Sequence, residues 1–174
     1  LDPSQWSDAD NDGFGDELRG TDGDYCPEVA GSSTIDRKGC LDSDGDGYSD
    51  PDSLWSTNLG GDAFPEDSTQ HFDGDGDGFG DNPEGYQPDS CPETFGTSTA
   101  DIFGCRDSDG DGWSDSADAF VDDNSQWSDQ DGDGYGDAQD GLLPDSCPTV
   151  FGNSTIPRYG CLDSDGDGLD DQLD

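Results

Sequence analysis

The chain has 174 residues, 26% of them hydrophobic, and a formal net charge of −40. So few apolar side chains exclude an ordinary hydrophobic core, because apolar burial at about 25 cal/mol per Å² must offset roughly 1–2 kcal/mol of backbone entropy per residue. The charge repels phosphates and anionic lipids. We therefore expect no nucleic-acid partner and no membrane insertion, and we expect cations as ligands.

This composition leaves two possibilities, a disordered acidic chain or a fold stabilised by cations and cross-links. The identity and the spacing of the acidic residues favour the second. Only 5 of the 45 are Glu, and the Asp residues recur with Gly in a fixed pattern. Six loops carry Asp at positions 1, 3, 5 and 9 and Gly at position 6, and they form pairs whose members begin 34 residues apart. This recurrence predicts three repeat units. The units are 1–69 (loops 8–19 and 42–53, with an insertion around 53–61), 70–125 (loops 73–84 and 107–118) and 126–174 (loops 129–140 and 163–174).

The loop pattern is typical of a calcium site. Ca²⁺ takes six to eight oxygens at about 2.3–2.6 Å, and Asp side chains at alternate positions of a curled loop can converge on one ion. Gly at position 6 permits the turn, position 7 offers its carbonyl, and position 9 contributes directly or through water. We expect six or more Ca²⁺ per chain. The predicted ligands at these five positions are Asp8, Asp10, Asp12, Phe14 and Asp16; Asp42, Asp44, Asp46, Tyr48 and Asp50; Asp73, Asp75, Asp77, Phe79 and Asp81; Asp107, Asp109, Asp111, Trp113 and Asp115; Asp129, Asp131, Asp133, Tyr135 and Asp137; and Asp163, Asp165, Asp167, Leu169 and Asp171.

Position 12, where an EF-hand loop carries a bidentate Glu, is less uniform. The predicted ligands there are Glu84, Asp118, Asp140 and Asp174. Arg19 and Ser53 occupy this position in the first two loops. The missing oxygens could come from Asp22 or Asp24 in the first loop and from Asp52 or Asp62 in the second, and we expect these two sites to be the weaker ones.

The six cysteines follow the same repeat, because each pair is 14 residues apart and lies between the two loops of its unit. This interval predicts the disulfides Cys26–Cys40, Cys91–Cys105 and Cys147–Cys161. On the chain-entropy model, closing such a loop with a disulfide stabilises the fold by roughly 3 kcal/mol. A zinc or iron site would need clustered Cys or His, which the sequence lacks. Disulfides and millimolar calcium together predict an extracellular or cell-surface location.

The segments between the cysteines combine apolar and hydroxyl residues. We expect the apolar ones to pack on the disulfides as miniature cores: Val29, Ile35, Phe95, Ile102, Val150, Phe151 and Ile156. The hydroxyl runs are either turn formers or sites of O-glycosylation at Ser33, Thr34, Ser98, Thr99 and Thr155. Asn153 begins an N-glycosylation sequon, so the chain is a candidate glycoprotein.

The Asp-x-Asp-x-Asp-Gly loops followed by "DYCP" (24–27), "DSCP" (89–92) and "DSCP" (145–148) resemble thrombospondin type 3 repeats. The resemblance implies that acidic repeats, with Asp8, Asp10, Asp12, Asp16 and their counterparts as ligands, wrap Ca²⁺ along a disulfide-pinned chain. Dockerins duplicate similar loops, but they need an amphipathic helix after each loop, where this chain has Gly and Pro. The expected fold is an irregular, loop-dominated, calcium- and disulfide-stabilised linear repeat array with little regular secondary structure.

The sequence offers no catalytic residues, and we expect no enzyme. His71 is the one histidine and takes the place of Trp6 and Trp127 in the other units, where we expect it to pack on a neighbouring loop. The leading hypothesis is a rigid structural spacer, stalk or filament subunit that continues head to tail with copies of itself or with further repeats. The alternative is a calcium-ordered adhesin or binding module that holds a protein or glycan through exposed aromatics such as Trp55. A calcium store or mineral nucleator is a third possibility.

Overall fold

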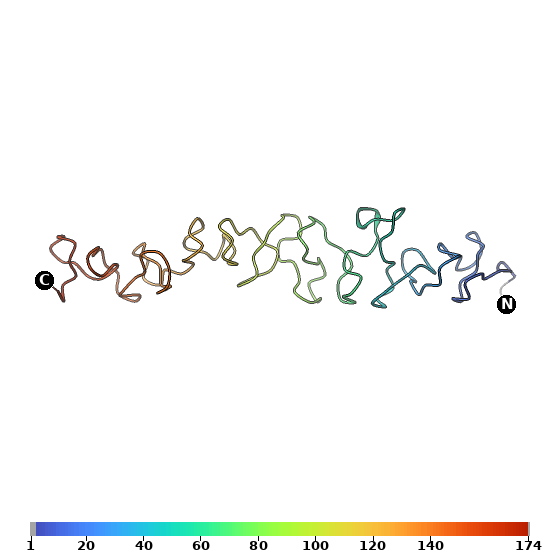
Figure 1. The fold of residues 1–174 in the computed structure, drawn as a ribbon, viewed down its shortest axis with the longest axis horizontal. Helices are drawn as coiled ribbons and strands as arrows, with labels where there is room; N and C mark the ends of the chain where they lie inside the picture. The colour runs from blue at the N-terminus through green and yellow to red at the C-terminus, as the bar shows by residue number, and fades with distance from the viewer. Residues whose placement is uncertain (1–2, 174) are drawn as a thin grey trace. The chain divides into compact units, whose positions relative to one another are not determined.

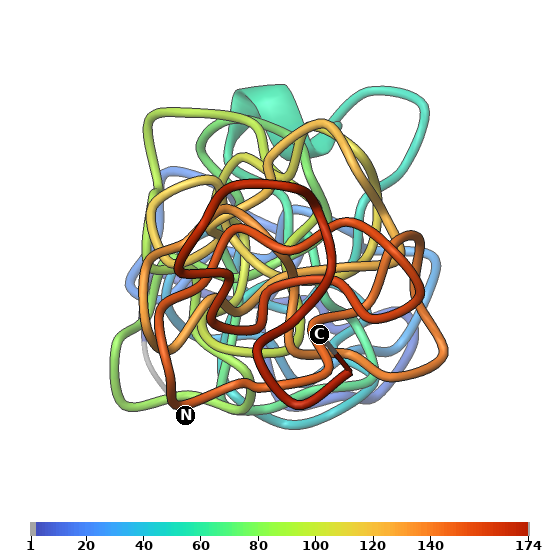
Figure 2. The same cartoon turned by 90° about the vertical axis from the view of Figure 1, so that its left-hand side faces the viewer.

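The computed structural model of the chain describes residues 3–173 and contains almost no regular secondary structure (Figure 1). Its helical element is one 3₁₀ turn, η1 (Thr57–Leu59), the coiled ribbon in Figure 2. Isolated bridges join Gly15 to Gly23, Gly80 to Pro88, Gly136 to Pro144, and Asp145 to Tyr159. Asp and Gly cause this irregularity, because Asp side chains bond their own backbone and Gly loses much entropy in regular elements. The predicted irregular, loop-dominated class is confirmed.

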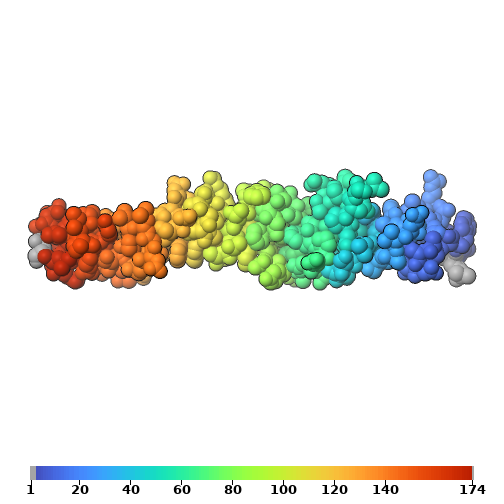
Figure 3. Space-filling model, viewed as in Figure 1, coloured from blue at the N-terminus to red at the C-terminus, as the bar shows by residue number. Residues whose placement is uncertain are grey.

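Two compact units make up the chain, Leu1–Glu93 and Thr94–Asp174. Within each unit the colours of Figure 3 follow chain order, so each segment lies beside the segments that precede and follow it in the sequence. Hydrogen bonds agree, with spans that reach 19 residues, as from the Gly31 N–H to the Asp12 carboxylate. The three repeat units remain a prediction, because they were defined by sequence recurrence, whereas the two compact units are defined by contacts in space. No helix in residues 3–173 has the length and apolar character needed to cross a bilayer.

All six cysteines are disulfide-bonded. The Cys26–Cys40 and Cys147–Cys161 bridges have Cα–Cα distances of 5.0 and 5.1 Å, as predicted from the 14-residue interval. The second cysteine of each pair is buried, and in residues 3–173 the buried apolar side chains are Cys40, Cys105 and Cys161. Disulfides therefore occupy the positions where a domain of this size normally places aliphatic side chains.

The expected miniature apolar cores are wrong. Most of the side chains assigned to them are exposed, and Ile102 is half-buried. The exposed ones are Val29, Ile35, Phe95, Val150, Phe151 and Ile156. Polar side chains fill the space instead. Ser33, fully buried, donates its hydroxyl proton to the Arg37 carbonyl and accepts the Cys40 N–H at 3.0 Å.

The same serine position recurs in each unit and bears on glycosylation. Ser98 and Ser154 are also buried, and each accepts the N–H of the second cysteine at 2.9 Å. The hydroxyls of Ser33 and Ser98 are thus used inside the fold, where a glycan has no room. The other predicted acceptors, Thr34, Thr99, Asn153 and Thr155, are exposed.

A glutamine clasp fastens the segment that follows each odd-numbered loop. Gln70 is 1% exposed, donates from Nε2 to the carbonyls of Asn82 and Tyr86, and accepts the Asn82 N–H at Oε1. Gln5 and Gln126 make the equivalent three bonds in their units. A Cβ on Gly80 would lie 2.2 Å from Gln70 Oε1, so this glycine is needed for the close approach.

We predict that Gln126→Leu lowers the free energy of unfolding of the calcium-loaded chain by about 1–3 kcal/mol, because the substitution leaves buried backbone groups unpaired. Denaturant unfolding followed by tryptophan fluorescence measures the change. Gln130→Leu is the matched control, since Gln130 is exposed. Equal stability of the two variants would contradict the clasp.

Candidate metal centres

Each acidic loop is curled by hydrogen bonds from its own backbone to its own carboxylates. In the second loop, Asp42 accepts the N–H groups of Gly45 at 2.8 Å and Gly47 at 3.1 Å, and Asp46 accepts the Tyr48 N–H at 2.8 Å. The other five loops repeat these bonds. The φ angle at position 6 is between 93° and 99° in every loop, which explains its glycine.

Position 4 has the same requirement, which the sequence pattern did not reveal. Its φ is positive in all six loops, and the residue is Asn11 in the first loop and glycine in the others. Asn is the non-glycine residue that tolerates this conformation best, because its short side chain bonds locally. The loop shape is thus fixed at two positions rather than at one.

The curled loops bring the carboxylates of positions 1, 3 and 5 together. In each triad, one oxygen from every member lies within 4.8 Å of the others. The triads include Asp8, Asp10 and Asp12; Asp42, Asp44 and Asp46; Asp73, Asp75 and Asp77; Asp107, Asp109 and Asp111; and Asp129, Asp131 and Asp133. Two oxygens bound to one Ca²⁺ are at most about 5 Å apart, so this spacing suits the ion. In the sixth loop, Asp163, Asp165 and Asp167 make the same backbone bonds.

Position 9 closes each loop. The Asp50 N–H donates to the Leu41 carbonyl at 2.7 Å, and the Asp50 carboxylate accepts the N–H and hydroxyl of Ser43. Both Asp50 oxygens are therefore engaged by protein donors. In the second loop this geometry favours contact with an ion through water over direct ligation. In the fifth loop one oxygen of Asp137 is instead buried without a hydrogen-bond partner, and the assignment of the position-9 residues as ligands stays a prediction.

A further carboxylate from beyond position 9, the outer carboxylate, faces each of the first five sites. Asp24, Asp62, Asp89 and Asp145 are 0%, 1%, 7% and 0% exposed. One oxygen of each accepts an N–H two residues on, at 2.6–2.7 Å, and the other is buried without a hydrogen-bond partner. Asp118 accepts the Phe120 N–H in the same way beside the fourth loop. A bound cation would compensate such buried, unpartnered oxygens.

The pKa values of these carboxylates reflect their burial and the charge of the loop beside each one. Burial first, and then the negative charges of Asp46, Asp44 and Asp50, raise the pKa of Asp62 to about 7. The pKa values of the other outer carboxylates are also raised, first by burial and then by the negative charges of the adjacent loop. The adjacent loop is the first for Asp24, the third for Asp89, the fourth for Asp118 and the fifth for Asp145. A bound cation would reverse this mutual repulsion.

The structure distinguishes between the two residues that the sequence offered as the additional ligand of each of the first two loops. In the first two loops it places Asp24 and Asp62 at the sites, whereas Asp22 pairs with Lys38, and Asp52 pairs with Arg37 at 2.8 Å. Asp118 lies beside the triad of the fourth loop, and its role as a ligand stays a prediction.

The third and fifth loops differ from the expectation drawn from position 12. Glu84 and Asp140 are exposed, and Asp89 and Asp145 face the sites instead. Asp174 lies outside the described residues. The sequence did carry a signal for the outer ligands, because Asp-x-Cys-Pro and Asp-Ala-Phe recur after the odd- and even-numbered loops.

In three loops the bulky side chain of position 7 contacts an aromatic ring of the segment that follows. Tyr48 stacks on His71 with ring centroids 3.9 Å apart, in the packing role expected of the histidine. Trp113 stacks on Trp127 at 6.3 Å, and Tyr135 meets Tyr159 at 5.6 Å. Each of these loops is therefore joined to its neighbour by a ring pair.

A scan against models of known protein families finds no match, and a search of curated proteins finds none either. The resemblance to thrombospondin type 3 repeats rests on the motifs alone. The repeated Asp triads and the local cysteine pairs that it implies are both present. Together they fit a calcium-binding, disulfide-stabilised protein.

We predict that Asp145→Asn weakens calcium binding at the fifth loop by about tenfold or more, because it removes a buried charge that faces the ion. Asp140→Asn removes the same charge from an exposed position of the same segment and should leave the affinity unchanged. Calorimetric titration of both variants measures the difference. The opposite ranking would restore the EF-hand assignment of position 12.

Without calcium, we expect the second loop to lose order as the pH rises from about 4 to about 7. The folded chain holds a proton on Asp62 up to about pH 7, whereas the unfolded chain releases it near the usual value of 3.8. The stabilisation is complete below the lower value and is lost as the pH passes the higher one. Amide exchange of residues 42–62 in chelator-treated protein, compared with Asp62→Asn, measures it, and a pH-independent exchange rate would contradict the assignment.

Proposed function

We propose that the chain is an extracellular calcium-binding repeat protein that serves as a rigid spacer, stalk or filament subunit and has no enzymatic activity. One observation carries the proposal: buried carboxylate oxygens without hydrogen-bond partners face the Asp triads, as in the pair formed by Asp62 and the second loop. A purely solvated acidic surface would leave such oxygens in water. Three disulfides are consistent with an oxidising compartment.

The proposed rigidity comes from charge compensation. Without cations the carboxylates repel one another, and the chain is expected to be expanded. Six Ca²⁺ would change the formal charge from −40 to −28, and each would hold a loop of about a dozen residues. Because the loops need the ion to complete their ligand sets, ion binding and folding become a single equilibrium.

Backbone hydrogen bonds link one loop to the next and support a stiff array. The Asp62 N–H donates to the Ser49 carbonyl at 2.9 Å, at the end of the second loop. The adjacent Ala63 N–H donates to the His71 carbonyl at 3.0 Å, just before the third loop. An outer ligand is thus tied to both loops. Arrays with neighbour-only contacts can continue into further repeats or stack head to tail on copies of themselves.

We predict that the oxidised, metal-stripped chain binds six or more Ca²⁺ in calorimetric titration, with Mg²⁺ a poor substitute because it keeps its waters. Small-angle scattering should change from an expanded chain to a rod with a radius of gyration well above the roughly 16 Å of a compact domain of this length. Two or fewer ions, or a compact globule with calcium, would overturn the proposal.

The adhesin or binding module is a second candidate, favoured by the many exposed apolar side chains, such as Leu54 at 83%. Trp55 itself is not a free aromatic, because its indole N–H donates to Asp36 at 3.0 Å and its ring lies 5.4 Å from the Arg37 guanidinium carbon. Glycosylation at the exposed Asn153, Thr34, Thr99 and Thr155 would suit either function, and intact mass of native protein tests it.

A further inference from the structure

An apolar groove lies beside the first disulfide. It has a volume of about 510 Å³, and its apolar lining residues are Tyr25, Pro27, Val29, Leu41, Pro51 and Leu54. Four of these side chains are more than half exposed, and Leu54 is 83% exposed. The volume is in the range of sites that take a small molecule or a few side chains of a partner.

The insertion of the first repeat unit, which the second unit lacks, builds one wall of this groove. The Asp52 carboxylate accepts the N–H groups of Leu54 at 2.7 Å and Trp55 at 2.9 Å, which turns the chain back on itself. Asp36 then holds the Trp55 indole, and Gly60 passes close to the ring. Leu54 is thus held in place by a fixed turn although its side chain is in solvent.

The three repeat units agree in their acidic loops and differ in this groove. Counted from the cysteines, Tyr25 is replaced by Ser90 and Ser146, and Pro51 is replaced by Ser116 and Gln172. Leu41 becomes Arg106 in the second unit, which also lacks a counterpart of Leu54, whereas the third unit keeps Val150 and Leu162 in place of Val29 and Leu41. Because the ion sites do not need Tyr25, Pro51 or Leu54, their presence together in the first unit indicates a separate role for that surface.

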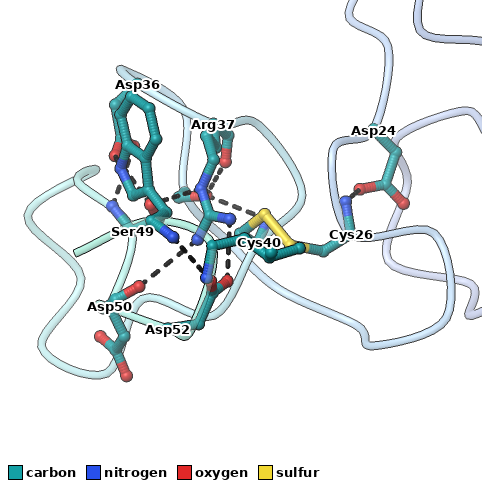
Figure 4. Close-up of polar contacts among 11 residues, drawn as sticks. Asp24, Cys26, Asp36, Arg37, Cys40, Ser49, Asp50 and Asp52 are labelled. Atoms are coloured by element: carbon teal, nitrogen blue, oxygen red, sulfur yellow. Dashed lines mark hydrogen bonds and ion pairs between the residues drawn. A yellow bond between two sulfur atoms is a disulfide. The ribbon is translucent and has the colours of Figure 1, made fainter. Parts of the chain in front are cut away.

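The rim of the groove is acidic, and its cation is already engaged. Glu28, Asp50 and Asp52 are its acidic residues. Arg37 donates to Asp52 at 2.8 Å, to Ser49 Oγ at 3.3 Å and to the Asp50 carbonyl at 3.5 Å, and its side chain is 13% exposed. Figure 4 shows Arg37 between these partners, next to the Cys26–Cys40 bridge.

We propose that this groove binds a cationic protein segment, whose apolar side chain enters between Leu54, Leu41 and Val29 while its Lys or Arg residues meet the rim. Charge complementarity selects this occupant. The chain carries −40, or −28 with six Ca²⁺, so charge disfavours an acidic copy or an anionic surface at this acidic rim. A cationic peptide is attracted by this charge, and the apolar lining of the groove fixes where the peptide binds.

The test uses the full oxidised chain in saturating calcium and a labelled peptide in which a Leu-Phe pair is flanked by lysines. Fluorescence anisotropy should show saturable binding that Leu54→Ser weakens by about tenfold, the loss expected for one buried leucine. Leu59→Ser is the matched control, because Leu59 is an exposed leucine of the same insertion outside the groove. Leu41→Arg should also weaken binding, whereas Leu162→Arg, its counterpart in the third unit, should not.

Peptides with one property removed decide between the alternatives. The proposal is overturned if a lysine peptide without the Leu-Phe pair binds as tightly, which would indicate polyelectrolyte attraction alone. It is equally overturned if the same apolar pair binds as well between serines or glutamates, or if the calcium-loaded chain self-associates through Leu54 in sedimentation. Calcium titration of Leu54→Ser should match the wild type, so failure here is distinguishable from failure of the calcium proposal.

Discussion

Uncompensated buried carboxylate is the constraint on which the rest of this structure depends. Asp24 and Asp62 each keep one oxygen away from water and without a hydrogen-bond donor, beside three or more further carboxylates. Such an arrangement is costly unless positive charge is supplied. The chain has only 5 basic side chains against 45 acidic ones, so it cannot compensate itself. Divalent cations are the simplest source of that charge.

Hydrogen bonding to the main chain takes over the positioning that apolar packing performs in ordinary domains. Ser33 holds the disulfide segment, Gln70 holds the segment after the third loop, and Asp42 holds the turn of its own loop. These bonds are directional, so each fixes a geometry rather than merely excluding water. One result is that aliphatic side chains have no interior to fill. They are left on the surface, where they are available for recognition.

The parts of the site that spacing predicts are those that form locally. The triads, the curled loops and the cysteine pairs follow from intervals that do not vary, because their partners are a few residues apart or closed by one bridge. The outer carboxylate lies 16 residues from the start of its loop after the first, third and fifth loops, but 20 residues after the second (Asp62) and 11 after the fourth (Asp118). Its short motif recurs in the sequence, but the sequence does not display the burial that separates Asp89 from the exposed Glu84. The prediction of miniature apolar cores was wrong for a related reason, because the presence of apolar residues in a sequence does not show whether the fold has an interior to bury them.

The short range of the hydrogen bonds has a consequence for how such a chain can evolve. A stretch of DNA encoding one pair of loops and its cysteine bridge carries nearly everything that the encoded segment needs to fold. Duplicating it adds a working module without disturbing older ones, and a join between modules can take up extra codons, as around Trp55, at little cost. Copies that keep their acidic loops are then free to diverge elsewhere, so that one module of an otherwise uniform series can acquire a property of its own.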